Sequence, residues 1–172
     1  MVLEPLPTAE LADAAGIPIA MDSRIRPVWR GARLAGPAFT VRTPPGEFVS
    51  VMEAAERATA GAVLVVDGGG DLGRALWGDK MSRLARDRGI AGLVVDGAVR
   101  DLDGIEALGF PVFAAGRVPT PPVRERRGEL EAQVACGGLT VRPGDLVYGD
   151  ADGVVVVPRE QHDEIVARLR TS

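Results

Sequence analysis

Three continuous apolar runs lie in the middle of the chain and predict the strands of a sheet. They are Ala62 to Asp67, Gly92 to Val95 and Pro111 to Ala115. Uninterrupted apolar runs of this length are typical of strands that are covered on both faces. Because segments with helical spacing separate them, the pattern predicts a parallel α/β sheet.

Apolar residues at helical spacing mark the two segments between these strands. The first helix is expected to begin near Asp79 and to end before Gly89, and the second to run from Asp101 to Leu108 with an acidic start. The apolar stripe of the first consists of Met81, Leu84 and Ala85. The two helices are therefore expected to connect neighbouring parallel strands.

Two more helices are expected before the sheet. Thr8 is placed to cap a short helix that Gly16 ends. A second helix is expected to continue up to Gly61 and to bury one apolar face. The residues of that face are Phe48, Val51, Met52 and Ala55.

Short β segments dominate the chain after Pro122. They are expected at residues 130–135, 139–141, 145–150 and 153–158, with turns at Gly137-Gly138, Pro143-Gly144 and Asp152-Gly153. Residues 159–169 have the pattern of an amphipathic closing helix. With neither a repeat nor a linker, residues 1–172 are expected to form a single α/β domain with additional antiparallel or mixed β structure.

The composition of the chain limits the kinds of site and the cellular location that can be expected. No run approaches the roughly 20 apolar residues that cross a bilayer, and the N-terminus lacks the order of a signal peptide, so a cytoplasmic protein without a membrane partner is expected. Cys136 and His162 are the only residues of their kinds, which excludes a disulfide framework and His-rich or Cys-rich metal sites. Cys136 is expected to be a small buried residue. Since Lys80 is the only lysine, any side-chain Schiff base would have to use it.

The net charge of -4 argues against a nucleic-acid partner. The one basic cluster, at Arg124, Arg126 and Arg127, is interrupted by Glu125 and followed by Glu129. This cluster is expected to be a solvated loop.

A glycine-rich stretch follows the first predicted strand and permits two interpretations. Gly68, Gly70 and Gly73 match the G-x-G-x-x-G pattern of dinucleotide-binding turns, and Asp96 follows as a possible ribose ligand. Asp67, however, stands where its charge would face the pyrophosphate. Flexible turn glycines are therefore the favoured interpretation.

Opposite charges adjoin at Arg100 and Asp101, after the second predicted strand. In the structural interpretation, Asp101 caps the next helix and Arg100 reaches solvent or a carboxylate. In the chemical interpretation, Asp101 binds a hard cation and Arg100 binds an oxyanion. Ligands of open α/β sheets bind beyond the carboxyl ends of strands, so Asp79 is expected to converge with this pair.

A metal at this edge would be held mainly by oxygen ligands, which selects Mg²⁺ or Mn²⁺. Such a site suits a small 2-oxo acid whose carboxylate and keto oxygens chelate the ion, while Arg100 neutralises the oxygen that becomes an enolate. Asp79 would position or deprotonate a water or hydroxyl. The backbone N–H groups expected to hold the substrate carboxylate at the helix start are those of Gly78, Asp79, Lys80 and Met81.

The spacing of these residues resembles the signature of the RraA-like family, which includes the regulator of RNase E activity A and the class II 4-hydroxy-4-methyl-2-oxoglutarate aldolases. Twenty residues separate Asp79 from Arg100-Asp101, within WGD…VVDGAVRD. Further matches are TAELADA near the start, GPAFTV from Gly36 to Val41, and VRPGDLVYGDADGVVVVP from Val141 to Pro158. The resemblance covers almost the whole chain.

The resemblance implies a swivelling β/β/α fold, usually assembled as a homotrimer or a dimer of trimers with sites between subunits. In the aldolases, the residue matching Asp101 holds the divalent metal, the one matching Arg100 contacts the keto oxygen of pyruvate, and the one matching Asp79 holds a water for proton transfer. Characterised aldolases are longer, and a glutamate from the C-terminal region of a neighbouring subunit helps complete their site. Glu160 and Glu164 lie in the closing helix here, and the resemblance assigns neither of them to that position.

Together these patterns favour a divalent-metal-dependent lyase that forms a pyruvate enolate. It would cleave 4-hydroxy-4-methyl-2-oxoglutarate or a related 4-hydroxy-2-oxo acid by retro-aldol reaction, or decarboxylate oxaloacetate. The alternative is a non-catalytic, protein-binding regulator of the RNase E type, since an acidic surface is compatible with a basic partner segment.

Overall fold

Strands and helices alternate through the first two thirds of the chain, and short strands fill most of the remainder. The computed structural model describes residues 2–171. The strands are β1 (Arg26–Pro27), β2 (Leu34–Arg42), β3 (Val63–Asp67), β4 (Gly92–Val99), β5 (Val112–Arg117), β6 (Glu129–Leu130), β7 (Val134–Cys136), β8 (Leu139–Val141), β9 (Leu146–Asp150) and β10 (Gly153–Val157). The helices are α1 (Thr8–Ala15), α2 (Val49–Arg57), α3 (Asp79–Asp87), α4 (Leu102–Leu108) and α5 (His162–Thr171), with a 3₁₀ turn at Arg159–Gln161.

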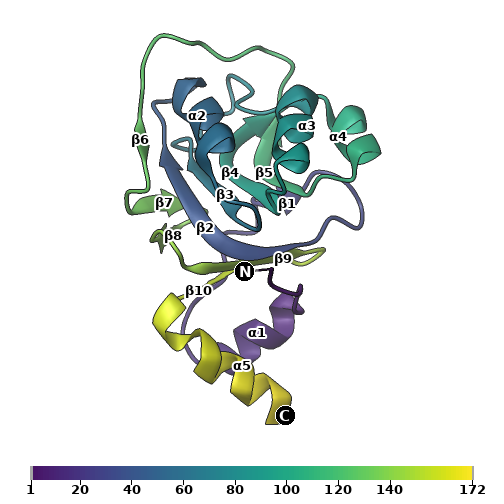
Figure 1. Ribbon diagram of the computed structural model, residues 1–172, viewed down its shortest axis with the longest axis vertical. Helices are drawn as coiled ribbons and strands as arrows, with labels where there is room; N and C mark the ends of the chain where they lie inside the picture. The colour runs from purple at the N-terminus through teal and green to yellow at the C-terminus, as the bar shows by residue number, and fades with distance from the viewer. Residues whose placement is uncertain (1, 172) are drawn as a thin grey trace.

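A mixed sheet runs through the centre of the molecule (Figure 1). Its strand order is β1-β5-β4-β3-β2-β9-β10, and β6 also pairs with β2. The strands β2, β3, β4 and β5 form the parallel part, whereas β1, β6, β9 and β10 pair antiparallel. β7 and β8 form a separate antiparallel pair. The predicted parallel α/β sheet is confirmed at β3, β4 and β5.

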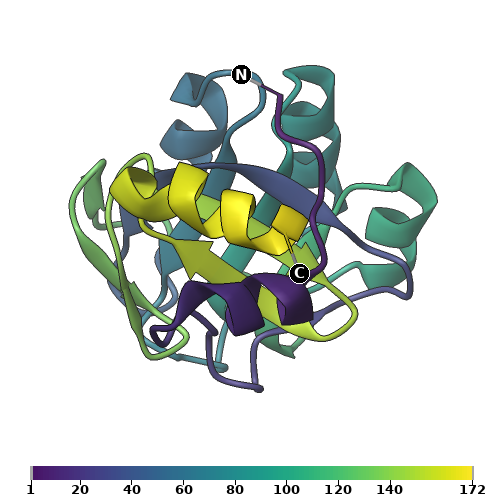
Figure 2. The same cartoon turned by 90° about the horizontal axis from the view of Figure 1, so that it is seen from below.

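Helices cover this sheet from two sides. Helices α2, α3 and α4 lie on one side of the parallel strands, and α1 and α5 lie beyond β9 and β10 on the other side (Figure 1). Seen from below, α1 and α5 run side by side across β9 and β10 (Figure 2). Between the two helical layers the sheet curves back on itself, which gives a helix, strand, strand, helix succession.

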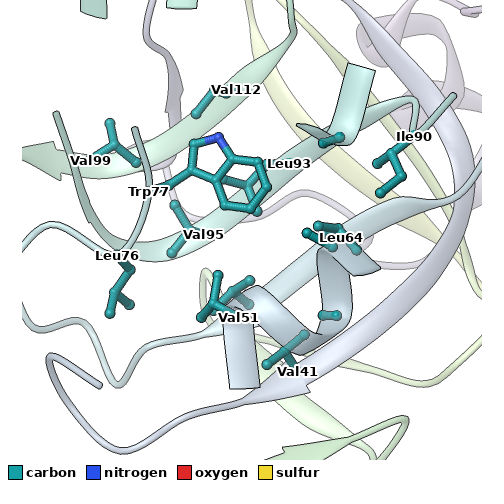
Figure 3. Packing of buried hydrophobic residues seen from close by; sticks show 14 of the residues in the cluster. Val41, Val51, Leu64, Leu76, Trp77, Ile90, Leu93, Val95, Val99 and Val112 are labelled. Atoms are coloured by element: carbon teal, nitrogen blue, oxygen red, sulfur yellow. The ribbon is translucent and has the colours of Figure 1, made fainter. Parts of the chain in front are cut away.

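Three apolar clusters fill the spaces between these layers. The first lies between α2, α3, α4 and the sheet, where Trp77 packs among Leu93, Val95 and Val112 (Figure 3). The Trp77 ring also stacks on Phe110, with 6.1 Å between ring centroids. Each fully buried aliphatic or aromatic side chain contributes about 1.5–3 kcal/mol, so this cluster anchors the segment that leads into α3.

The other two clusters explain the curvature of the sheet. The second lies inside the curl and joins β3 and β4 to β7, β9 and β10, and the third lies under α1 and α5. Strand β2 links the two halves, because Leu34 to Pro37 pair antiparallel with β9 and Ala38 to Arg42 pair parallel with β3.

Strand β2 was not expected from the sequence, although it is central. Pro37 lacks an N–H group, and Gly36 interrupts the apolar pattern, so the segment lacks the usual signature of a strand. The structure tolerates Pro37 because it lies where β2 changes from one partner strand to the other. Gly36 has no side chain because Gly61 approaches it closely. A Cβ at Gly36 would lie 2.2 Å from the Gly61 carbonyl oxygen.

Several predicted boundaries differ from the observed ones. The β segment expected at residues 130–135 is split between β6 and β7, which belong to different sheets. Strand β4 continues past Val95 to Val99, with an irregular register between Val95 and Ala98. Helix α2 ends at Arg57 rather than at Gly61. The closing helix begins with a 3₁₀ turn.

The predicted cap at Thr8 is wrong. Thr8 is the first residue of α1, and its side chain makes no cap. Instead, its hydroxyl group donates to Asp150 Oδ1 at 2.7 Å and its N–H group donates to Asp150 Oδ2 at 2.9 Å. Burial raises the pKa of Asp150, but these bonds, the hydrogen bond from the N–H of Asp152 and the charge of Arg33 together outweigh it and lower the pKa below its ordinary value. Thr8 therefore ties α1 to the end of β9, while Gly16 ends the helix in the left-handed region as predicted.

Candidate active site

The segment before α3 is held directly against the end of β4. The N–H of Leu76 donates to the Ala98 carbonyl at 2.8 Å, and the N–H of Arg100 donates to the Trp77 carbonyl at 3.0 Å. These bonds extend the pairing of parallel strands beyond β3. Gly78 and Asp79 are therefore brought beside Arg100 and Asp101, as the sequence predicts.

A buried hydrogen-bond chain fixes the turn into α3. The indole N–H of Trp77 donates to Ser82 Oγ at 2.7 Å, and the Ser82 hydroxyl donates to the Gly78 carbonyl at 2.9 Å. Ser82 is fully buried and Trp77 is almost fully buried. The first N–H groups of a helix have no acceptor within the helix. The hydrogen bonds from Trp77 to Ser82 and from Ser82 to Gly78 hold these N–H groups of α3 at a defined orientation.

Asp101 adopts an unusual backbone conformation at the start of α4. Its φ of 60° and ψ of 42° lie in the left-handed region, where within residues 2–171 only Glu131 joins it among residues other than glycine. Asp101 occupies the N-cap position of α4, but its side chain makes no cap there. Its Oδ2 instead accepts a hydrogen bond from the N–H of Asp79 at 3.3 Å. Backbone strain of this kind concentrates at functional sites.

Two glycines make room for the carboxylates. A Cβ at Gly78 would lie 2.4 Å from Asp101 Oδ2, and a Cβ at Gly104 would lie 2.9 Å from Asp79 Oδ2. Both distances are shorter than those of ordinary contacts. The helix starts of α3 and α4 therefore approach one another across Asp79 and Asp101.

One cleft of about 510 Å³ contains every site residue that the sequence predicts. These residues are Gly78, Asp79, Lys80, Met81, Arg100 and Asp101. The remaining lining residues are Phe48, Met52, Ala75, Leu76, Trp77, Pro122 and Arg124. The cleft thus has an apolar wall from α2 and a charged wall from the starts of α3 and α4.

The cations of this cleft are available to a ligand. The guanidinium of Arg100 donates to the Pro119 carbonyl at 3.2 Å. Within residues 2–171, no carboxylate lies within 4.0 Å of the charged groups of Lys80, Arg100 or Arg124. A cation without a bonded acid partner is suited to bind an anionic substrate.

The acids of the cleft suit an open metal site better than a closed one. Asp79 and Asp101 are its only lining carboxylates, and the described part of the chain contains no group of three His, Cys, Asp or Glu residues that could hold a metal. Mg²⁺ is commonly bound by one or two carboxylates, with waters and substrate oxygens completing its octahedron. The donor set therefore fits Mg²⁺ or Mn²⁺ with substrate oxygens as further ligands.

Arg124 is a cleft residue that sequence reasoning missed. The basic cluster lies in an exposed, irregular segment, which confirms the expected solvated loop, but this loop is also bound to α2 and to the residues before it. The Arg124 guanidinium lies over the Phe48 ring, 4.9 Å from its centroid, and Arg126 and Arg127 form ion pairs with Glu47 and Glu53. No signal in the sequence relates residues 124–127 to residues 47–53.

The glycine stretch is a structural turn. The N–H of Gly69 donates to Asp67 Oδ1 at 3.0 Å, and the N–H of Gly70 donates to the Asp96 carbonyl at 3.0 Å, so neither is available to a pyrophosphate. Helix α3 begins at Asp79 rather than at the glycines. The structure thus supports the turn interpretation over the dinucleotide one.

Asp96 is a structural residue beside this turn. It accepts hydrogen bonds from both terminal nitrogens of Arg24 and from the N–H of Gly137. Burial raises the pKa of Asp96, but the bonds from Arg24 and Gly137 outweigh it and lower the pKa below its ordinary value. The carboxylate therefore joins β4 to the turn after β7.

The remaining candidate residues lie away from the cleft. Glu160 pairs with Arg142 and Glu164 pairs with Arg168. His162 Nε2 lies 2.7 Å from the Tyr148 hydroxyl. Cys136 is fully buried, as expected, and burial raises the pKa of its thiol.

The chain matches known proteins over most of its length. Residues 8–156 match the model of the family described as RraA-like: Aldolase/RraA. A protein of Halalkalibacterium halodurans named "Putative 4-hydroxy-4-methyl-2-oxoglutarate aldolase" is 38% identical over 165 residues, which cover 96% of this chain and 79% of that protein.

Solved structures agree with this match. The RNA-processing inhibitor RraA from Thermus thermophilis superposes with a TM-score of 0.82 at 32% identity, covering 90% of this chain and 94% of that one. Streptomyces coelicolor RraAS2, described as an unusual member of the RNase ES inhibitor RraA protein family, gives a TM-score of 0.85 at 31% identity, covering 96% and 87%. Among residues 2–171, no helix has the length and apolar character needed to span a membrane. The chain belongs to the RraA-like family, and its fold is the α/β fold of that family.

Proposed function

We propose that this protein is a divalent-metal-dependent lyase that forms a pyruvate enolate. Its substrate is 4-hydroxy-4-methyl-2-oxoglutarate or a related 4-hydroxy-2-oxo acid, or else oxaloacetate. The observation that carries the proposal is the convergence of Asp79, Arg100 and Asp101 with the start of α3 on one cleft. The name of the H. halodurans relative supports an aldolase, and the activity itself is our inference.

The residues of the cleft divide the chemistry among them. The N–H of Asp79 donates to Asp101 Oδ2. The N–H groups of Gly78, Lys80 and Met81 therefore remain to bind the carboxylate next to the keto group, because a helix N-terminus favours an anion. Arg100 stabilises the negative charge that develops on the keto oxygen. Asp101 holds Mg²⁺ or Mn²⁺, which when bound supplies a Lewis acid that polarises this oxygen.

Asp79 serves the proton transfers. In the retro-aldol direction, a water positioned by Asp79 accepts the proton of the C4 hydroxyl group while the C3–C4 bond breaks. The bonding electrons pass to the keto oxygen as an enolate, and protonation at C3 releases pyruvate. With oxaloacetate, loss of CO₂ leaves the same enolate. Asp79 is half-buried, and its carboxylate lies where a Cβ at Gly104 would come within 2.9 Å of Oδ2.

Pyruvate release tests the proposal. It should be measured from both substrates with Mg²⁺, with Mn²⁺ and with a chelator, after correction for spontaneous decarboxylation. We expect Arg100→Met and Asp101→Asn to lower turnover by about 10²–10³-fold. Arg117→Met and Asp103→Asn are matched controls, because both residues are exposed and lie outside the cleft. Equal turnover with metal and with chelator would contradict the proposal.

A second candidate function is regulation of an RNase E-type enzyme. The likeness to the Thermus and Streptomyces proteins favours it, because both are described as inhibitors of RNA processing or of RNase ES. A pull-down with the intact protein that recovers an RNase E-type enzyme would support it.

We also propose a homotrimer or hexamer in the cytoplasm, and light scattering tests the assembly.

A further inference from the structure

The cleft contains a third cation that the proposed mechanism does not use. Arg124 lies in the segment that connects β5 to β6, seen in Figure 1 as the long green arc over the end of α2. Residues 119–128 are here called the strap. The proposed reaction engages Arg100 and the start of α3, so the role of Arg124 requires a separate explanation.

The strap is held in place on both sides of Arg124. On one side, Val123 forms backbone hydrogen bonds with Phe48 at 2.9 Å and with Gly46 at 2.8 Å. On the other, Glu47 accepts hydrogen bonds from the N–H groups of Glu125 and Arg126, at 2.9 and 3.0 Å. Arg124 is therefore flanked by anchored residues.

Glu47 is a suitable anchor because it is buried and charged. Its exposed fraction is only 2%. The hydrogen bonds from the N–H groups of Arg126 and Glu125 lower the pKa of Glu47 below its ordinary value, although burial opposes them. A charged acceptor binds N–H groups more strongly than a neutral one. Glu47 is thus a positioning residue for the strap.

The guanidinium of Arg124 is itself oriented by an aromatic face. It lies over Phe48, which is 95% buried and therefore rigid. The other basic residues of the strap have acid partners, Glu47 for Arg126 and Glu53 for Arg127, whereas Arg124 has none within 4.0 Å in the part of the chain that the structure describes. Only Arg124 of these three lines the cleft.

We propose that Arg124 binds the second carboxylate of a dicarboxylic 2-oxo acid and thereby selects such substrates. This inference rests on the proposed function, in which the start of α3 and Arg100 bind the 2-oxo acid end. In 4-hydroxy-4-methyl-2-oxoglutarate, the C5 carboxylate remains on the departing pyruvate, so Arg124 would hold the leaving fragment throughout cleavage. A planar guanidinium matches a carboxylate with two hydrogen bonds.

Equilibrium binding separates this role from catalysis. The probes are 2-oxoglutarate, which has the C5 carboxylate but no C4 hydroxyl group to cleave, and 2-oxopentanoate, which has the same length without that carboxylate. Isothermal titration with Mg²⁺ is measured for the wild type and for Arg124→Met. Arg127→Met is the matched control, since it removes an equal charge from the same strap outside the cleft.

We expect the wild type and Arg127→Met to bind 2-oxoglutarate about 10- to 100-fold more tightly than 2-oxopentanoate, which is the range for one charged hydrogen-bonded pair. Arg124→Met should lose that preference while its affinity for 2-oxopentanoate changes by less than about 2-fold. Glu47→Gln should reduce the preference partly.

Four outcomes would overturn the inference. If Arg124→Met kept the preference for 2-oxoglutarate over 2-oxopentanoate, the C5 carboxylate would bind elsewhere. If Arg127→Met lost this preference as fully as Arg124→Met, the preference would come from the general positive charge of the strap. Equal affinity of the wild type for both probes would remove the subsite and leave the proposed lyase intact. If neither probe bound to the wild type, the 2-oxo acid site itself would be wrong, and the proposed function would fail with the inference.

Discussion

Gly78→Ala should disable the cleft while leaving the fold almost unchanged. The backbone of Gly78 is extended, with φ of -155° and ψ of -165°, so alanine fits without backbone strain. Its Cβ would lie 2.4 Å from Asp101 Oδ2 and 3.6 Å from Arg100 Cγ. Since ordinary contacts begin at 3.4 Å, the carboxylate must move by about 1.0 Å, the difference between 3.4 and 2.4. A displacement of that size costs on the order of 10²-fold in rate.

Two measurements on Gly78→Ala check this reasoning. Metal-dependent pyruvate release should fall by about 100-fold, whereas the free energy of unfolding in urea should change by less than about 1 kcal/mol, because Asp101 is exposed and can move. Gly73→Ala is the control, since its Cβ would meet nothing closer than 3.5 Å. Wild-type turnover in Gly78→Ala would refute the claim that the placement of Asp101 matters.

Three further predictions concern strain, charge and packing, and urea unfolding measures each. Asp101→Gly relieves a left-handed backbone, so the free energy of unfolding should stay equal or rise by up to about 1 kcal/mol. Metal-dependent turnover should be lost in this variant. A large loss of stability would contradict the prediction. The lowered pKa of Asp96 means that its charge stabilises the fold above the ordinary pKa of 3.8, and that this contribution disappears as the pH falls through the folded value. Arg24→Met should therefore cost about 1–3 kcal/mol at neutral pH and reduce the loss of stability in acid; an unchanged acid transition would count against the pair. Gly36→Ala should cost about 3 kcal/mol or more, because its Cβ would lie 2.2 Å from the Gly61 carbonyl oxygen, and a neutral effect would show that β2 can shift.

The predictable part of the fold is the part that local patterns determine. The strands β3, β4 and β5 are continuous apolar runs, and α3 and α4 have helical spacing between them. Strand β2 was not predicted because its two halves pair with different strands. Only the tertiary structure shows that a proline can lie where the partner strand changes. Thr8 failed as a cap for a similar reason, since Asp150 competes for its hydroxyl and N–H groups.

The candidate site was predictable as far as it follows strand ends. Asp79, Arg100 and Asp101 come together because neighbouring parallel strands end at one edge of the sheet, and the sequence marks those ends. Arg124 could not be found in this way. Its place depends on Glu47 and Phe48, more than seventy residues earlier, which hold the strap by hydrogen bonds and ring contact.

Hydrogen exchange into pyruvate shows whether this cleft forms a pyruvate enolate. The methyl protons of pyruvate exchange with D₂O only through the enolate, by loss of a proton from the methyl carbon and return of a deuteron, so the assay involves neither a distal carboxylate nor cleavage of a C–C bond. Nuclear magnetic resonance should show Mg²⁺-dependent loss of the methyl signal with the wild type and with Asp103→Asn, well above the rate without protein. Asp101→Asn and Arg100→Met should reduce it to that background. Exchange at the background rate by folded, Mg²⁺-supplied wild type would contradict enolate formation in this cleft.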